Sequence, residues 1–115
     1  MTDSPRLKPQ WFHVLLSIAD APLHGTAIME EVLDRTDGAI RLWPGALYGC
    51  LKDLTEAGLA GEVAAPEEAP TERGKRRFYL ITPEGRLALR RETERMAGYV
   101  RIAEQRLVGG GPDQT

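Results

Sequence analysis

The stretch PGALYGCLKDLTEAGL, residues 44–59, places a turn signal directly in front of a helical pattern. Pro44 suits the first turn of a helix, where its missing backbone N–H would have no partner in any case. The apolar residues that follow are spaced three and four apart: Leu47, Cys50, Leu51 and Leu54. The opposite face carries Gly45 and Gly49, although an exposed glycine inside a helix costs about 1 kcal/mol relative to alanine. Because glycine lets a backbone approach closely, this face is predicted to lie against another surface.

Two further helices are predicted before this stretch. Residues 11–19, WFHVLLSIA, are dense in apolar side chains at helical spacing, and Pro22 disfavours helical geometry at the residue before it. The second helix is expected over residues 24–36, where an Asp-Gly pair closes it. Residues 40–42 then form a short connector or a strand.

Two strands are expected after the third helix, at residues 59–64 and 76–81. Between them lie 11 polar and proline-rich residues, APEEAPTERGK, which predict a hairpin with a long loop. Phe78 and Leu80 are expected on one face of the second strand, opposite Tyr79.

The end of the chain predicts one long helix. Thr82 can cap it, Pro83 suits its first turn, and Glu84 complements its dipole. A heptad seam then extends over about three heptads, to about residue 108. The seam residues are Leu89, Thr93, Met96, Val100, Ala103 and Leu107. The final residues, 109–115, are expected to be disordered.

The bulk composition fits one modest domain. The chain has 115 residues, of which 42% are hydrophobic and 28% charged. No apolar run approaches the length of a membrane span, and the first ten residues contain no secretion-type apolar segment. With a single cysteine, Cys50, no intrachain disulfide can form. We therefore expect a cytoplasmic protein without a membrane association.

The charge is unevenly distributed. Residues 1–64 carry 5 basic and 9 acidic side chains, for a net −4, whereas residues 72–77, ERGKRR, carry 4 basic and 1 acidic, for +3. The whole chain, at −2, is not a basic nucleic-acid binder. A concentrated basic tip can still dock on phosphate, because the local field decides the contact.

The predicted order is helix, helix, helix, strand, basic loop, strand and long helix. This order is the plan of a winged helix-turn-helix protein, an α+β fold that is mostly helical. In helix-turn-helix proteins the second helix of the motif enters the major groove of DNA, and here that helix is residues 44–57.

Three stretches resemble the PadR family of transcriptional regulators, in its short form with a single C-terminal dimerisation helix. They are FHVLLSIADAPLHGTAIMEEV, LWPGALYGCLKDLTEAGLAGE and RRFYLITPEGRLAL, and together with the intervening residues they span about residues 9–92. The combination of LHG, PGALY and YLITPEG, in this order, makes the resemblance specific. The sequence departs from the family at Thr26, where an aromatic residue is usual, and at Ala46 and Gly49, where polar or larger side chains are common.

The resemblance implies a homodimeric DNA-binding repressor whose long last helix pairs the subunits. Residues 1–82 would form the winged helix-turn-helix domain, and residues 83–108 the dimerisation helix. Two-fold symmetry then predicts a palindromic operator on double-stranded DNA.

The candidate DNA contacts come from the third helix and from the basic loop. On the helix they are Pro44, Gly45, Ala46, Tyr48, Gly49 and Lys52. In the loop, which would form the wing, they are Arg73, Lys75, Arg76 and Arg77. Tyr48 has an alternative role as a rim residue over the core, Lys52 as a solvated surface lysine, and Gly49 as a residue that relieves crowding inside the protein or reflects tolerated drift.

The seam of the last helix predicts the dimer interface, because a small domain can hardly cover it alone. The interface candidates are Trp11, Phe12, Leu89, Met96, Val100, Ala103 and Leu107. A small aromatic effector is a further candidate partner, bound in a cavity between subunits. Its candidate contacts are Trp11, Met96 and Tyr99, with Trp43 beside them, although such residues are more often simply core.

Enzyme and metal functions find no support in the sequence. His13 and His24 are the only histidines, and with one cysteine there is no zinc-ligand cluster, so we expect neither a metal nor a cofactor. The rival function is a winged-helix protein-interaction module without specific DNA binding. The acidic charge of residues 1–64 and the absence of polar side chains at Ala46 and Gly49 favour it, whereas the basic loop opposes it.

Overall fold

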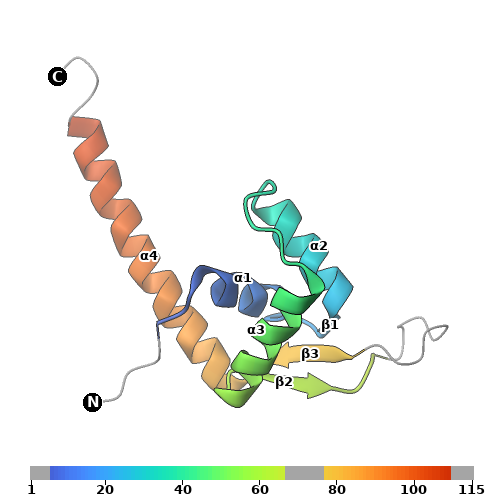
Figure 1. Cartoon of the computed structure of the whole chain (residues 1–115). Helices are drawn as coiled ribbons and strands as arrows, with labels where there is room; N and C mark the ends of the chain where they lie inside the picture. The colour runs from blue at the N-terminus through green and yellow to red at the C-terminus, as the bar shows by residue number, and fades with distance from the viewer. Residues whose placement is uncertain (1–5, 67–76, 110–115) are drawn as a thin grey trace.

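The computed structural model describes residues 6–66 and 77–109. The elements follow one another as α1 (Pro9–Ser17), β1 (Leu23–His24), α2 (Gly25–Arg35), α3 (Pro44–Glu56), β2 (Ala60–Val63), β3 (Phe78–Ile81) and α4 (Pro83–Gly109) (Figure 1). This is the mostly helical α+β fold that the sequence predicts. The arm before residue 6, the loop at 67–76 and the tail at 110–115 lie outside the described residues.

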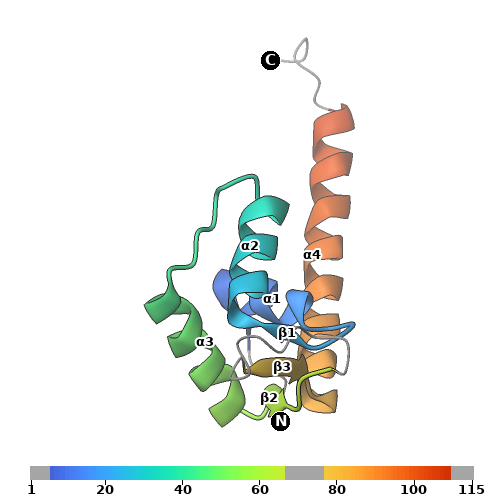
Figure 2. The ribbon, with the colours of Figure 1, turned by 90° about the vertical axis from the view of Figure 1, so that its right-hand side faces the viewer.

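The core forms around α1, which contacts α2, α3 and α4. The two views together show α1 between α3 and α4 (Figures 1 and 2). The largest fully buried side chains come from the first three helices: Val14, Leu15, Ile18, Ile28, Val32, Leu47, Leu51 and Leu54. Each such side chain contributes about 1.5–3 kcal/mol through removal from water, so this cluster holds the three helices together.

The helix boundaries agree with the sequence to within two residues. α1 begins at Pro9 rather than at residue 11, because proline occupies its first turn without losing a hydrogen bond. The start of α2 is capped by His24, whose Nδ1 accepts a hydrogen bond of 3.4 Å from the backbone N–H of Ala27. α3 spans Pro44–Glu56, and Gly58 follows it with φ of 80°, a left-handed conformation that favours glycine.

The sheet has three antiparallel strands in the order β1-β3-β2. Ala60 pairs with Ile81 and Val63 with Phe78 across the predicted hairpin. The third strand, β1, was not predicted; its two residues pair with β3 and thereby place the start of α2 against the sheet. Residues 40–42, for which a strand was the alternative, form a connector.

β3 has the predicted alternation, and its face with Tyr79 is the inner one. Tyr79 and Ile81 belong to the core cluster, whereas Leu80 is only partly buried. Phe78 is buried on the other side of the strand, with its ring edge-on to His24 at 5.5 Å between centroids. A tyrosine can bury its ring while its hydroxyl reaches a polar rim, so a period-two pattern of apolar residues did not identify the inner face.

α4 starts at a tight junction with the end of α3. The Thr82 hydroxyl accepts a hydrogen bond of 2.9 Å from the backbone N–H of Gly85, which confirms the predicted cap, and donates one of 2.6 Å to the carbonyl of Gly58. A Cβ atom on Gly85 would overlap the backbone carbonyl oxygen of Leu59. Glycine is therefore required here by the close approach of two backbones.

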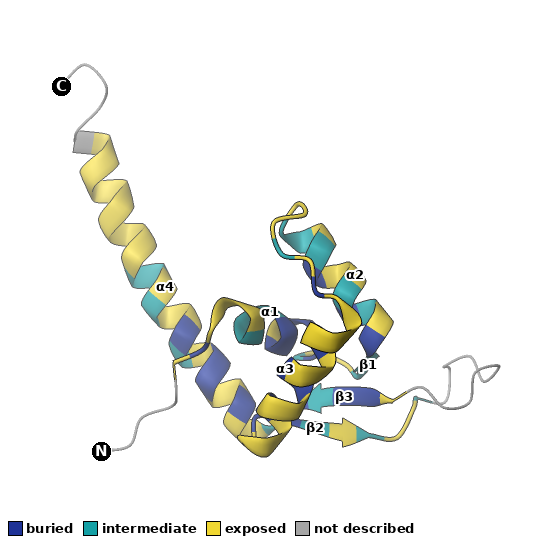
Figure 3. Cartoon of the chain, in the orientation of Figure 1, coloured by how far each residue is buried: buried dark blue, intermediate teal, exposed yellow. Residues whose placement is uncertain are grey.

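The far half of α4 projects beyond the core. The helix has 27 residues, which corresponds to about 40 Å, and the chain extends 60 Å along its longest axis. Figure 3 shows the far half of α4 as largely exposed, in contrast to its first three turns. It has the extended form expected of a helix that pairs with a second surface.

A pair of glycine substitutions tests the junction. Gly85→Ala is expected to lower the free energy of unfolding by about 1–3 kcal/mol, since the new methyl group meets a backbone carbonyl that cannot move without displacing β2. Gly49→Ala, which also lies in a helix, meets open space and is expected to raise it by up to about 1 kcal/mol. Urea denaturation at one fixed protein concentration measures both. Equal stability of the two variants would contradict the close contact at Gly85.

Candidate nucleic-acid interface

The face of α3 away from the core is exposed, as predicted. The exposed positions on this face are Pro44, Gly45, Ala46, Tyr48, Gly49 and Lys52. The inward positions are buried, with Leu47 and Leu54 fully so. The structure thus brings the six predicted contact residues of α3 onto one accessible surface.

The two glycines on this face are not required by the packing of the chain. A Cβ atom at Gly45 or Gly49 would meet no other atom within 4 Å. The alternative that Gly49 relieves crowding inside the protein is therefore wrong. The face of α3 has room for a surface that approaches its backbone closely.

Tyr48 combines an exposed ring with a packed hydroxyl. Its exposure is 43%, and a Cβ atom on Gly25 would overlap the Tyr48 hydroxyl and lie 2.9 Å from the ring carbon that bears it. The first glycine of α2 therefore makes room for this ring. The contact fixes the ring between α2 and α3 and supports the rim role, while more than a third of the side chain stays accessible.

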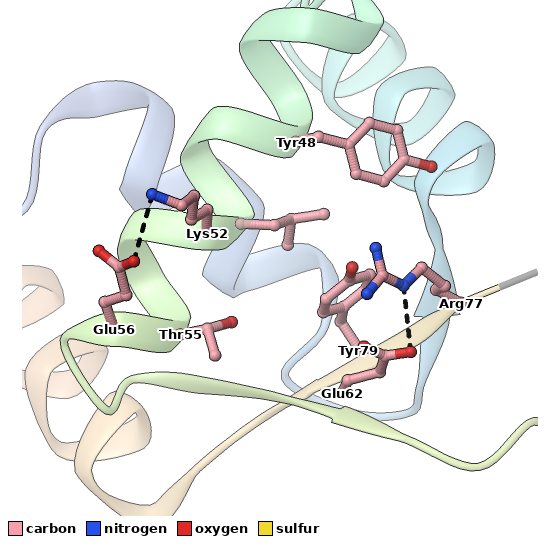
Figure 4. A pocket seen from close by; sticks show the side chains of 8 residues that line it. Tyr48, Lys52, Thr55, Glu56, Glu62, Arg77 and Tyr79 are labelled. Atoms are coloured by element: carbon pink, nitrogen blue, oxygen red, sulfur yellow. Dashed lines mark hydrogen bonds and ion pairs between the residues drawn. The ribbon is translucent and has the colours of Figure 1, made fainter.

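A groove of about 400 Å³ separates α3 from the strands β2 and β3 (Figure 4). Tyr48 and Lys52 border it on the helix side, and Arg77 and Glu62 on the strand side. The hydroxyl end of Tyr79 also faces it, which explains how this largely buried residue reaches a polar rim. The groove brings two of the predicted contacts of α3, Tyr48 and Lys52, together with Arg77.

Both predicted cations in the groove are paired with carboxylates of the same chain. Lys52 Nζ lies 3.2 Å from Glu56, and Arg77 Nε donates a hydrogen bond of 3.2 Å to Glu62. That hydrogen bond raises the pKa of the Arg77 guanidinium above its ordinary value. Because these pairs are exposed, they are weak and can be exchanged for another anion.

The two pairs differ in how visible they are in the sequence. Lys52 and Glu56 are four residues apart on a helix, a spacing that brings side chains together and that sequence reasoning overlooked. Glu62 and Arg77 meet only through the register of β2 and β3, where Glu62 lies opposite Tyr79. Arg73, Lys75 and Arg76 lie outside the described residues.

The predicted dimer face divides into a buried and an exposed part. Leu89 is 8% exposed and belongs to the chain's own core. Farther along α4, the exposed fraction rises from 37% at Met96 through 53% at Val100 to 72% at Leu107, and Ala103 is also exposed. Along the predicted seam, the apolar side chains that the described residues leave uncovered therefore begin at Met96.

Two aromatic residues predicted for the dimer interface lie on α1, the helix that contacts α4. Trp11 and Phe12 are partly buried and pack against the core. The Lys8 ammonium lies 5.7 Å from the centre of the Trp11 ring. Both rings keep some accessible surface on the helix that contacts α4, so their assignment to a dimer interface stays a prediction.

The four predicted effector residues do not form one cluster within the chain. Met96 and Tyr99 lie on α4, whereas Trp43 directly precedes α3, on the other side of α1 (Figure 2). Trp43 lines a separate hollow of about 260 Å³ between α2 and α3. A cavity that joins all four residues within one subunit is therefore excluded.

One cation beside α3 was missed by the sequence reasoning. The guanidinium of Arg41 lies over the ring of Trp43, with Cζ 5.3 Å from the ring centre. The two residues are two apart in the connector before α3, a spacing that points both side chains to the same side of an extended segment. A basic and an aromatic residue at this spacing are the signal in the sequence from which the contact could have been predicted.

Neither a metal cluster nor a membrane helix is found in the described ranges. Residues 6–66 and 77–109 contain no group of three or more histidine, cysteine or acidic side chains placed to hold a metal ion. Within the same ranges no helix is both long enough and apolar enough to cross a membrane. Cys50 is buried on the inward face of α3.

A family model described as the transcriptional regulator PadR-like family matches residues 14–91. The chain belongs to this family. The match includes α2, α3, the hairpin and the start of α4, so it covers the groove described above. Membership assigns the protein to the transcriptional regulators that the sequence resemblance indicated.

Similar proteins agree with this assignment. A PadR family transcription regulator from Clostridium difficile has a similar structure, with a TM-score of 0.64, 23% identity, and coverage of 84% of this chain and 98% of that one. A transcriptional regulator from Clostridium thermocellum has a TM-score of 0.66 at 18% identity, covering 84% and 91%. These TM-scores show that the fold is shared.

A curated relative is closer in sequence. It is described as an uncharacterized 37.1 kDa protein in transposon TN4556 of Streptomyces fradiae, and it is 42% identical over 84 residues. The match covers 73% of this chain but 22% of the relative. The chain thus corresponds to about a fifth of the length of that protein.

The thiol on α3 yields a prediction about pH. Burial, with a smaller contribution from Asp53, raises the pKa of Cys50 to about 11. An unfolded chain releases this proton at a lower pH than the folded one, so the stability contribution is present below the unfolded pKa and is lost as the pH rises toward about 11.

The comparison of wild type with Cys50→Ala measures this contribution. We expect the difference in unfolding free energy between the two proteins to shrink as the pH rises through that interval. We also expect the wild-type thiol to react slowly with a thiol reagent at pH 8 until the chain unfolds. Rapid modification of the folded protein would show that the thiol is accessible and contradict its burial.

Proposed function

We propose that the protein is a DNA-binding transcriptional repressor that acts as a homodimer. The observation that carries this proposal is the exposed face of α3, with open space at Gly45 and Gly49 and a groove beside it that Lys52 and Arg77 border. α3 enters the major groove of double-stranded DNA, and the loop between β2 and β3 acts as the wing on flanking DNA. The chain's membership of a family of transcriptional regulators supports this function.

The chemistry of this face favours backbone contacts over direct base readout. Gly45, Ala46 and Gly49 offer no side-chain donors or acceptors to base edges. Tyr48 and Lys52 offer a hydroxyl and an ammonium, which suit phosphate oxygens. Affinity should therefore come mainly from phosphates, and specificity in part from the shape and deformability of the DNA.

The dimer follows from the far half of α4. Its exposed apolar side chains are Tyr99, Val100, Ile102, Leu107 and Val108, with Met96 and Ala103 beside them. Soluble proteins rarely leave such a face open to water, and a heptad seam is suited to pairing with a second helix. In a symmetric dimer each subunit presents one α3, which predicts a palindromic operator with half-sites spaced by helical turns.

The second candidate function is a protein-interaction module without specific DNA binding. The carboxylates that pair with Lys52 and Arg77 favour it, because they reduce the positive charge on the groove. Salt dependence discriminates the two functions. A DNA complex weakens steeply as salt rises, whereas an interaction module forms no specific DNA complex at any salt concentration.

The first experiment compares binding to the promoter region of the protein's own gene with binding to random DNA of equal length, at two salt concentrations. We expect tight promoter-specific binding by the wild type. The wing variant Lys75→Ala/Arg76→Ala/Arg77→Ala should bind more weakly, with a shallower salt dependence, because three phosphate-seeking charges are lost.

The matched variant changes the opposite charges of the same loop. Glu67→Gln/Glu68→Gln/Glu72→Gln should bind both DNAs more tightly, since it removes like-charge repulsion from phosphate. No binding of the wild type to either DNA at low salt would favour the protein-interaction module. If neither variant changed binding, the assignment of the loop as a DNA-binding wing would be wrong, while the rest of the proposal would stand.

The second experiment tests the dimer. Val100→Glu is expected to produce monomers and to abolish promoter binding, because it places a charge in the apolar face of α4. Gln105→Glu adds the same charge on the same helix at an exposed position off the seam and should leave the dimer intact. Light scattering coupled to size-exclusion chromatography measures the mass of each variant. A wild-type monomer at all concentrations would refute this arrangement.

A further inference from the structure

The segment before α3 carries an exposed aromatic side chain with a cation stacked on it. Trp43 is 65% exposed and immediately precedes Pro44, the first residue of α3. The guanidinium of Arg41 lies 5.3 Å from the centre of its indole ring. Exposed tryptophans are enriched at surfaces that contact other molecules, and the exposure of this one has no explanation in the packing of the chain.

The charge of Arg41 differs from that of the other cations near α3. Lys52 and Arg77 are each paired with a carboxylate of the same chain. Among the described residues no carboxylate forms an ion pair with Arg41, whose contact is with the neutral ring of Trp43. Glu30 lines the same hollow as Arg41 without forming an ion pair with it, so the charge of Arg41 is less compensated than those of Lys52 and Arg77.

The contact with the ring also favours one placement of the guanidinium. A cation–π contact attracts the planar group to the ring face and leaves its edges, which carry the N–H donors, free for another partner. Phosphate oxygens are the acceptors that such an edge binds with two parallel hydrogen bonds. Because a held side chain loses less conformational entropy on contact, the ring prepares Arg41 for an anion.

The position of the pair selects DNA as the source of that anion. Trp43 is continuous in the chain with Pro44 and Gly45, the exposed start of the face proposed to enter the major groove. Arg77 lies at the groove beside the middle of α3, so Arg41 and Arg77 flank the helix at different points along its length. A groove-bound helix is flanked by two phosphate backbones, which two such cations can reach.

We propose that Arg41, held over the Trp43 ring, binds a DNA phosphate beside the start of α3. Arg41 supplies the charge and the donors, and Trp43 is a positioning residue. This inference rests on the proposed DNA-binding function and adds to it a phosphate contact at the start of α3, apart from the groove that Tyr48 and Lys52 border. Trp43 also lines a hollow together with Met29, Leu33 and Leu42.

The test uses the full chain and a fluorescein-labelled duplex of mixed sequence, about three helical turns long. A mixed sequence is suitable because phosphate contacts act on any DNA, so the operator need not be known. Affinity is measured by fluorescence anisotropy between about 50 and 200 mM salt. For Arg41→Gln we expect a loss of about fivefold at 0.15 M salt and a salt slope shallower by about one, the effect of one lost phosphate contact.

Arg90→Gln is the matched control. Arg90 is exposed on α4, on the other side of α1 from α3, and the substitution makes the same change of charge (Figure 2). We expect its affinity and salt slope to remain within twofold of wild type. Circular dichroism and the subunit mass confirm that both variants stay folded and keep the same assembly.

A double-mutant cycle tests the positioning role of Trp43. Trp43→Ala alone is expected to weaken binding by about two- to fivefold, the range expected when a cation–π contact at an exposed site is lost. In the Arg41→Gln background the same change should have no further effect. A full effect of Trp43→Ala in that background would show that the indole contacts the partner by itself and would overturn the positioning role.

The remaining outcomes separate this inference from the proposed function. If wild type binds the duplex and Arg41→Gln matches it in affinity and slope, the phosphate contact is wrong while the proposed function stands. If Arg41→Gln and Arg90→Gln lose affinity equally, the effect is one of net charge and the specific contact is wrong. If wild type binds no DNA at low salt, both the function and the contact are overturned.

Discussion

The threonine hydroxyl between β3 and α4 fixes the relation between the two helices that matter most. Thr82 donates to the carbonyl of Gly58, beyond the end of α3, and accepts from the N–H of Gly85, inside the first turn of α4. Its own backbone N–H donates to the carbonyl of Leu59 at 3.1 Å. These bonds satisfy groups at two helix ends that would otherwise lack partners. They also set the direction in which α4 leaves the core, and with it the position of the apolar face of α4 relative to the exposed face of α3.

The groove beside α3 has a low net charge, because acidic as well as basic residues line it. Lys52 and Arg77 both have carboxylates within ion-pair distance. A phosphate that approaches them takes the place of Glu56 or Glu62 rather than finding an empty cation. Such an exchange lowers affinity for any polyanion equally, so binding depends more on contacts that only a well-fitted duplex makes. The protein's net charge of −2 acts in the same direction at long range.

The helices and the family could be predicted from the sequence because strong local signals mark them. Proline starts, glycine stops and apolar spacing of three and four bounded α3 to within a residue. The strand β1 was missed because two residues carry no pattern, and only their pairing with β3 makes them a strand. The inner face of β3 could not be identified from the sequence, because Tyr79 buries a ring that also has a polar end. The chemistry of a side chain indicates whether it can be buried. Which face of the strand is buried depends on the elements that pack against it.

The candidate site could also be predicted only in part from the sequence. The exposed face of α3 followed from helical periodicity alone, and the structure confirms that its predicted residues are accessible. The pairing of Arg77 with Glu62 depends on strand register, which the sequence did not specify. The contact between Arg41 and Trp43 was overlooked because a search for charge finds clusters such as ERGKRR. A single arginine two residues from a tryptophan does not stand out in such a search.

The empty space at Gly45 and Gly49 has a consequence for how such a regulator can change over generations. A Cβ atom can be introduced at these two positions without contact with the rest of the chain, and most residues that carry one favour a helix more than glycine does. The surface proposed to contact DNA is thus uncoupled at these positions from the core that maintains the fold. New target preferences can arise here by single substitutions that leave the protein folded, whereas a change at Gly85 would endanger the structure first.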